Sequence, residues 1–180
     1  IAASYFHDRF QLGLKEAGML AGSFGVLAIF ARSLGGYLGD RAGRRFGLDG
    51  RGRFLTAMLF AEGLGLIVFS RMGAVVPAAI ALVSFGLFVH IAAGATYSVV
   101  PFIKPNGVGA VAGIVGAGGN VGAVLAGLLF RGSTSSTQTG LLWLGGAVLV
   151  SAALAAMVRF GRPAASVAAS VPSPEALPAE

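Results

Sequence analysis

The chain has 180 residues, of which 56% are hydrophobic and only 11% are charged, and its mean hydropathy is +0.83. Soluble domains carry roughly 25% charged residues, so this composition excludes an ordinary soluble domain. The absence of cysteine and the presence of only two histidines argue against disulfide frameworks, thiol catalysis and zinc sites. The formal net charge is +6, but the basic residues stand between apolar runs. They are typical of membrane topology signals, and we expect no nucleic-acid partner.

Five segments are long and apolar enough to cross a bilayer, which requires about 20 residues, with about 17 as the lower limit. They are residues 17–39, 54–70, 72–100, 107–130 and 140–158. The third is long, and we expect it to be tilted or shortened near Pro77. The sequence therefore predicts an all-α membrane protein in contact with the lipid bilayer.

The flanking residues complete the predicted organisation. Residues 1–12 are expected to hold the end of an earlier helix and an outer loop, and residues 13–161 the five-helix membrane domain. Residues 162–180 are rich in Ala, Ser and Pro, which predicts a disordered tail.

The distribution of Lys and Arg predicts the orientation of these helices. Eight basic residues lie on the side that holds the loop after residue 39, the loop after residue 100 and the C-terminal end, whereas four lie on the opposite side. The positive-inside rule makes the side with eight charges cytoplasmic. We therefore expect a multi-pass protein of the inner (plasma) membrane, with its C-terminus in the cytoplasm and its N-terminal end outside.

Arg32 belongs to no loop. It lies four residues past the middle of the first segment, which is about 6 Å from the centre of the span. A charge at that depth costs at least about 2.5 kcal/mol and is a functional-site candidate by default, although a structural ion pair or a snorkelling side chain is the alternative. Gly18, Gly25 and Gly39 share its helical stripe and would let a helix or a ligand approach closely. A guanidinium suits a small planar oxyanion held by paired hydrogen bonds.

Asn120 plays a comparable part near the middle of the fourth segment. It stands in a glycine-rich run that includes Gly116, Gly118, Gly119 and Gly122. Close packing of helices through small residues, with Asn120 as an interhelical hydrogen-bonding group, is the alternative to a binding role. The run lacks the strand–helix context of a dinucleotide-binding loop.

Four further polar residues inside the segments are candidates for lining a cavity, namely His90, Thr96, Tyr97 and Glu62. Such residues more often satisfy each other or lie at the membrane interface. Glu62 is a possible proton carrier or an ion-pair partner for Arg32. The sequence holds no nucleophile–base pair and no metal-ligand cluster, so we expect no enzyme activity, no catalytic residues, no metal and no cofactor.

The stretch 36–45 reads Gly-Tyr-Leu-Gly-Asp-Arg-Ala-Gly-Arg-Arg. It resembles the cytoplasmic loop signature of the major facilitator superfamily, G-x-L-x-D-R-x-G-R-R. In that family the Asp and Arg help to lock the cytoplasmic gate through contacts with helix ends. The resemblance assigns this role to Asp40, Arg41, Arg44 and Arg45.

Other stretches narrow the resemblance to nitrate/nitrite porters, in the branch of bacterial assimilatory and plant high-affinity nitrate transporters. Residues 30–36 resemble their eighth helix, whose arginine contacts the anion, residues 94–102 the end of their tenth helix, and residues 4–10 the outer end of their seventh. Residues 113–122 resemble their second nitrate signature, on the eleventh helix. The order and spacing agree over about 160 residues of the printed sequence.

The resemblance implies the C-terminal half of a major facilitator fold, with helices eight to twelve and a stub of helix seven. It implies transport of nitrate or nitrite by alternating access, with Arg32 and Asn120 as substrate-binding residues. The implied partners are the anion, a missing N-terminal six-helix half, and protons or a counter-anion. Two alternatives are a facilitator for another small anion and a non-transporting membrane scaffold or fragment.

Overall fold

The computed structural model describes residues 2–130 and 137–160 of the chain. Within these ranges the chain is helical and contains no strand, which confirms the prediction of an all-α membrane protein. The elements are α1 (Ala2–Phe10), α2 (Leu14–Ser70), α3 (Val75–Ile103), the short 3-10 helix η1 (Pro105–Gly107), α4 (Val108–Leu129) and α5 (Thr137–Met157).

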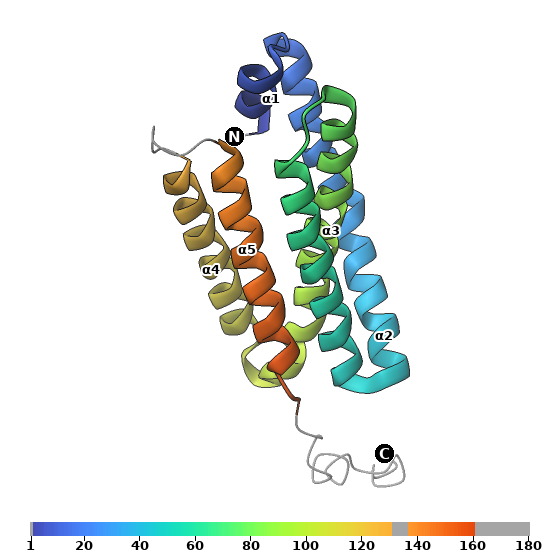
Figure 1. The fold of residues 1–180 in the computed structure, drawn as a ribbon. Helices are drawn as coiled ribbons and strands as arrows, with labels where there is room; N and C mark the ends of the chain where they lie inside the picture. Colours follow the sequence, from blue (N-terminus) through green and yellow to red (C-terminus); the bar gives the residue numbers. More distant parts are fainter. Residues whose placement is uncertain (1, 131–136, 161–180) are drawn as a thin grey trace, which may run out of the picture.

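Helix α2 corrects one sequence expectation. Residues 40–53 were expected to form a loop between two spans, but they are helical on both sides of a single break at Gly47, where φ is 67° and ψ is −160°. Glycine alone adopts this backbone conformation readily. A straight helix of 57 residues would be about 85 Å long, whereas the chain reverses direction at the break (Figure 1). We call residues 14–46 the first arm of α2 and residues 48–70 the second arm.

The described residues contain four helices that are long and apolar enough to cross a membrane. They are α2, α3, η1 together with α4 (Pro105–Leu129), and α5. Because α2 contributes two arms, all five expected segments lie in helices, and the ends of α3, α4 and α5 fall within three residues of the expected ends. Pro77 lies in the first turn of α3, where its missing N–H has no intrahelical partner to lose. The expected disordered tail lies outside the described residues.

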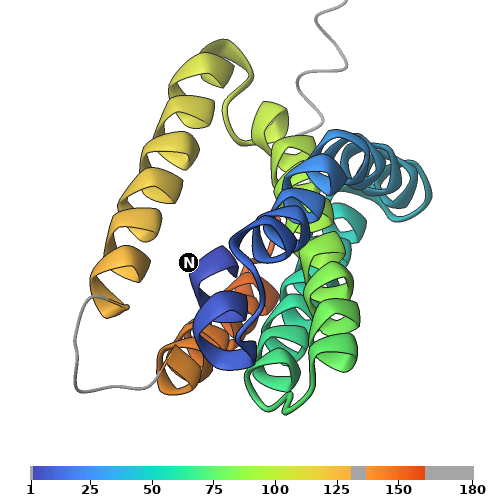
Figure 2. The same cartoon turned by 90° about the horizontal axis from the view of Figure 1, so that it is seen from above.

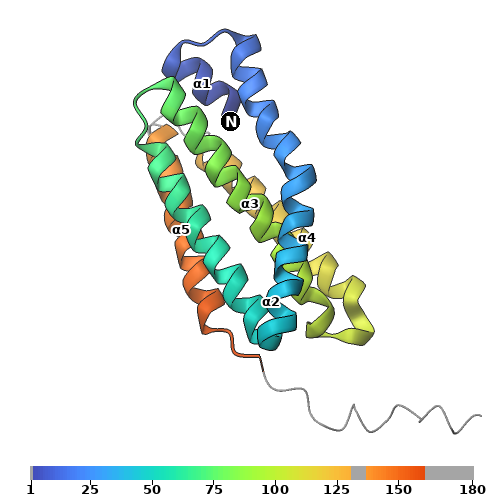
Figure 3. The ribbon, with the colours of Figure 1, turned by 90° about the vertical axis from the view of Figure 1, so that its right-hand side faces the viewer.

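Helix α3 packs along both arms of α2, and α5 packs along the second arm (Figures 1 and 3). The second arm and α5 approach closely at small residues, because a Cβ atom placed at Gly63 would lie 3.2 Å from the carbonyl oxygen of Gly145. Buried aromatic rings fill the core where α1 meets α2 and α3. They include Tyr5, Phe6, Phe69 and Phe85.

Helix α4 stands apart from the other helices (Figure 2). None of its residues is buried, and a Cβ atom placed at any of its seven glycines meets nothing within 4 Å. Since the helix is strongly apolar and glycine-rich, one of its faces has room for a partner that the described residues do not supply.

The two ends of the bundle differ in what they carry. The Gly47 turn, η1 and the end of α5 lie together at one end, and α1 and the connection between α2 and α3 lie at the other (Figures 1 and 3). We call the first of these the turn end. The basic loop residues that were expected to share one side of the membrane therefore lie at one end of the molecule, as far as the structure describes them.

Candidate functional site

An open groove of about 610 Å³ lies between α2 and α3 and contains Arg32. Because the groove runs from Arg32 to the turn end, we call it the Arg32 groove. The first arm of α2 contributes four lining residues, the second arm one and α3 five. They are Arg32, Ser33, Gly36, Asp40, Arg51, Gly94, Tyr97, Ser98, Pro101 and Phe102.

The backbone of Arg32 is fixed by an unusually close helix crossing. A Cβ atom placed at Gly94 would collide with the carbonyl oxygen of Arg32 and would lie 2.8 Å from the nitrogen of Gly36. At Gly35 a Cβ atom would lie 2.8 Å from the Cα of Ile91. Only glycine permits α2 and α3 to touch backbone to backbone here. The crossing holds the main chain of Arg32 against α3 while its exposed side chain lines the groove.

This crossing differs from the glycine stripe expected from the sequence. Gly39 does approach α3, because a Cβ atom there would lie 3.0 Å from the Cβ of Ser98. Gly18 and Gly25 have nothing within 4 Å of an added Cβ. The contact face therefore runs through Gly35 and Gly39, one helical turn apart. The stripe predicted from the sequence included neither Gly35 nor its partner Gly94 on α3.

Arg51 is a second candidate functional residue. From the sequence alone it was only one of the eight basic residues on the side expected to be cytoplasmic. Its guanidinium forms an ion pair with Asp40 and donates a hydrogen bond of 2.9 Å to the carbonyl oxygen of Ser98. It also lies 4.5 Å from the ring centre of Phe102, which permits a cation–π interaction. Arg51 thus ties both arms of α2 to the end of α3.

The expected gate residues therefore divide into two groups. Asp40 lies in the groove and pairs with Arg51, whereas Arg41, Arg44 and Arg45 are exposed at the turn end. Gly43 belongs to the same signature and lies against the Arg51 side chain, since a Cβ atom there would lie 2.7 Å from the Cζ of Arg51. In the sequence, this contact is indicated only by a glycine on one side of the Gly47 turn and an arginine on the other.

The other polar candidates occupy three different environments. Tyr97 is 48% exposed and lines the Arg32 groove. His90 is buried, and its Nε2 lies 3.0 Å from the carbonyl oxygen of Phe24 in the first arm of α2. Thr96 donates a hydrogen bond of 2.9 Å to the carbonyl oxygen of Ala92 in its own helix. Of these three residues, the structure brings only Tyr97 into the groove with Arg32.

Glu62 lies away from Arg32, in a separate cavity of about 320 Å³ that is lined by residues from all five α-helices. Its neighbours along the cavity wall are mainly apolar, such as Leu66, Phe85 and Leu144. The structure therefore does not pair Glu62 with Arg32.

Asn120 and the glycine-rich signature lie on α4, apart from the groove. Asn120, Gly118, Gly119 and Gly122 are exposed and Gly116 is partly exposed. Asn120 is not among the residues that line the groove. In the described residues the two expected substrate-binding side chains are thus presented by separate parts of the bundle.

The groove can hold a small anion through its donors. Arg32 and Tyr97 supply a charged planar fork and a hydroxyl. Ser33 also lines the groove, but its hydroxyl already donates to the carbonyl oxygen of Ile29 at 3.4 Å. The charge of Arg51 is already paired with Asp40. Arg32 is therefore the unpaired cation of the groove, as far as the described residues show.

Comparison with known proteins identifies relatives over most of the chain. It is 42% identical to high affinity nitrate transporter 2.5 of Arabidopsis thaliana over 149 residues, which cover 81% of this chain and 29% of that protein. It is 37% identical to high-affinity nitrate transporter 2.3 of Oryza sativa subsp. japonica, over 81% of this chain and 28% of that protein. It is 32% identical to the nitrate/nitrite transporter NrtP of a Picosynechococcus strain, over 67% of this chain and 22% of that protein.

These homologues are high-affinity nitrate transporters and nitrate/nitrite transporters, and they confirm the resemblance to nitrate/nitrite porters that the motifs indicated. The chain spans less than a third of the length of each of these three relatives. No family model matches the chain, and no solved structure matches it.

Proposed function

We propose that this homologue of the nitrate/nitrite porters forms the C-terminal half of a transporter that moves nitrate or nitrite across the membrane by alternating access. The observation that carries the proposal is its 42% identity to a high affinity nitrate transporter over 81% of the chain. The position of Arg32 on an open groove near the middle of an apolar span supports it. Transporter homologues also point away from an enzyme.

Arg32 is the proposed anion ligand of this half. Nitrate is planar and carries one negative charge, so two parallel N–H donors of a guanidinium match two of its oxygens. Inside a membrane protein the attraction between the two charges is stronger than in water, because the surroundings have a lower dielectric constant. The glycine crossing fixes the backbone of Arg32 and leaves its side chain free to reach the anion.

The rest of the binding site is proposed to come from elsewhere in the complete protein. Porters of this kind bind substrate near the bilayer midplane, between two related halves, and the groove is open on one side. An N-terminal half would supply the opposite face of the site. Asn120 and the glycine signature of α4 would then shape the neck of the pathway and allow helices to slide as the gate changes state.

Uptake of the anion requires coupling to another ion. A charge of −1 that enters a negative-inside cell is opposed by about 2.3 kcal/mol per 100 mV. We therefore expect protons to accompany the anion, or a counter-anion to leave in exchange. In the proposed orientation the protein lies in the inner (plasma) membrane, with the turn end and the C-terminus in the cytoplasm.

Uptake of labelled nitrate tests the proposal in cells that produce the complete gene product containing these residues. Arg32→Lys keeps the charge but removes the planar fork, and we expect it to lower uptake at least tenfold, with Asn120→Ala giving a smaller loss. Arg71→Lys, at the opposite end of the bundle, is the matched control and should transport normally. Unchanged uptake by Arg32→Lys at equal surface abundance would rule out Arg32 as the ligand. Competition by nitrite, chlorate and formate then measures the anion preference.

A further inference from the structure

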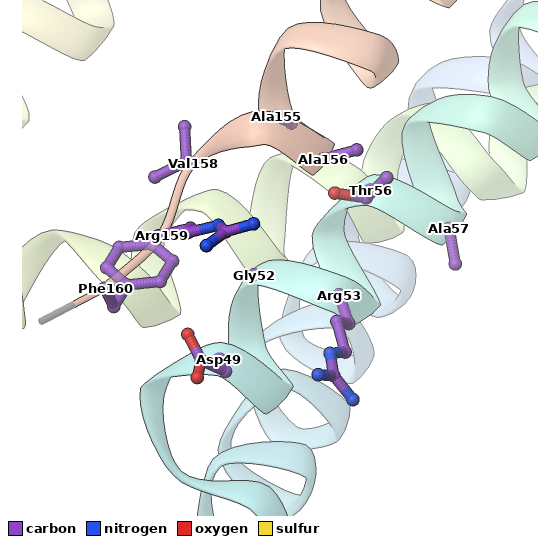
Figure 4. Close-up of a pocket in the computed structure, with 10 residues that line it drawn as sticks. All are labelled: Asp49, Gly52, Arg53, Thr56, Ala57, Ala155, Ala156, Val158, Arg159 and Phe160. Carbon is purple, nitrogen blue, oxygen red and sulfur yellow. The ribbon is translucent and has the colours of Figure 1, made fainter. Parts of the chain in front are cut away.

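A second cavity, of about 590 Å³, lies at the turn end between the second arm of α2 and the end of α5. It shares no residue with the Arg32 groove, and we call it the α2–α5 cavity. Figure 4 shows the residues that line it. They are Asp49, Gly52, Arg53, Thr56, Ala57, Ala155, Ala156, Val158, Arg159 and Phe160.

The charges around the α2–α5 cavity favour an anion. Arg53 comes from the second arm of α2, and Arg159 follows the end of α5, so the two cations are supplied by separate elements. Asp49 is the single acid of the wall and leaves the three charged groups with a net charge of +1. In the part of the chain that the structure describes, neither arginine forms an ion pair with a carboxylate.

Thr56 offers an unused hydrogen-bonding group at the same wall. Hydroxyls inside apolar helices commonly bond to the carbonyl four residues earlier, as Thr96 and Ser151 do here. The hydroxyl of Thr56 is buried and has no hydrogen-bond partner among the described residues. It points toward the guanidinium of Arg159 across the cavity (Figure 4). An oxygen-rich ligand held by Arg159 would supply the missing partner.

The position of the cavity indicates where such a ligand comes from. Arg53 directly precedes the apolar run of the second arm, and Arg159 lies two residues beyond the end of α5 at Met157. Basic residues at the ends of neighbouring membrane helices lie at the depth of lipid headgroups, where pockets of this kind bind lipid phosphates.

The remaining wall of the cavity suits the apolar part of a lipid. Ala57, Ala155, Ala156 and Val158 are small or apolar and would accept the glycerol backbone and the start of an acyl chain. The ring of Phe160 closes the cavity against Gly52, where an added Cβ would lie 2.7 Å from its Cε2.

We propose that the α2–α5 cavity binds the phosphodiester headgroup of an anionic phospholipid. Arg159 holds the phosphate oxygens, and Thr56 donates its free hydroxyl to the same group. Arg53 extends from the same wall away from these two residues (Figure 4) and adds its positive charge to the cavity. A phosphodiester with a single negative charge matches the net charge of +1 in the wall, whereas a zwitterionic headgroup brings a cation of its own. Inorganic phosphate shares the recognised chemistry but leaves the apolar wall unused.

Native mass spectrometry and thermal unfolding of the complete gene product in detergent test this proposal without any transport measurement. The probes are phosphatidylglycerol, phosphatidylcholine of the same acyl chains, and inorganic phosphate. We expect phosphatidylglycerol alone to remain bound and to raise the unfolding temperature. Equal stabilisation by phosphatidylcholine, or stabilisation by inorganic phosphate, would overturn the assignment to an anionic lipid.

Variants locate the site. Arg159→Gln should raise the apparent Kd for phosphatidylglycerol at least fivefold and Arg53→Gln by a smaller factor, whereas Arg71→Gln at the opposite end should leave it unchanged. Thr56→Val removes a hydroxyl that has no protein partner, so the lipid-free protein should unfold at the same or a higher temperature while its lipid-dependent stabilisation shrinks. Lipid binding that none of the three cavity variants weakens would overturn the proposal.

Discussion

At the scale of single residues, Arg51 is a charged residue whose contacts join the two arms of α2 to the end of α3. Its side chain is only 12% exposed, whereas that of its partner Asp40 is 51% exposed. A pair that is open to water on one side is worth little by itself. The additional contacts with the Ser98 carbonyl and the Phe102 ring compensate the desolvation of the guanidinium. Arg51 should therefore matter more to stability than Asp40 does.

Two single variants measure this difference. We expect Asp40→Asn to lower the free energy of unfolding by about 1 kcal/mol and Arg51→Gln by about 2–3 kcal/mol, because it also loses the Ser98 and Phe102 contacts. Unfolding by SDS in mixed micelles provides the readout. Arg44→Gln is the control, since Arg44 is exposed. Equal losses in Asp40→Asn and Arg51→Gln would show that the ion pair alone carries the contribution.

At the scale of elements, the crossing of α2 and α3 determines where Arg32 lies. The backbones touch at Gly35 and Gly94, so the separation of the two helices is fixed by the absence of two side chains. Gly94 contacts the backbone of Arg32, and Tyr97, one turn later on α3, lines the Arg32 groove.

Alanine at Gly94 tests the crossing. Its methyl group would collide with the Arg32 carbonyl, and overpacking of this kind costs about 1–3 kcal/mol. We expect Gly94→Ala to lower both thermal stability in detergent and nitrate uptake, because the displaced backbone carries Arg32 with it. Gly18→Ala is the matched control on α2, where an added Cβ meets nothing within 4 Å, and it should be neutral or more stable by up to about 1 kcal/mol. If both alanine variants behaved alike, the close crossing would not be what positions Arg32.

The elements also show what the sequence can and cannot predict. Apolar length alone placed α3, α4 and α5 to within three residues, because a bilayer requires about 20 apolar residues in a row. Hydropathy does not predict helices in polar segments. Residues 40–53 are basic and were therefore expected to form a loop, although they are helical. The pairing of Asp40 with Arg51 and the meeting of Gly35 with Gly94 depend on the turn at Gly47 and on helix placement, which no local pattern contains.

At the scale of the whole molecule, the two ends of the bundle differ in charge. The Gly47 turn, η1 and the end of α5 share the turn end (Figure 1), and the basic residues of these connections include Arg44, Arg45, Lys104 and Arg159. Arg71 marks the opposite end, at the close of α2. The basic residues of separate connections, which the positive-inside rule treats as markers of the cytoplasmic side, thus lie together at the turn end.

Cysteine labelling in intact cells checks which face is cytoplasmic. These 180 residues contain no cysteine, so none has to be removed from this part of the protein before single cysteines are introduced. Arg44, Gly73 and Asn106 are all exposed. If the turn end faces the cytoplasm, a membrane-impermeant maleimide should label Gly73→Cys in intact cells, and should label Arg44→Cys and Asn106→Cys only after permeabilisation. Labelling of Arg44→Cys before permeabilisation would invert the orientation. It would also place the α2–α5 cavity, and the lipid proposed to bind there, in the outer leaflet.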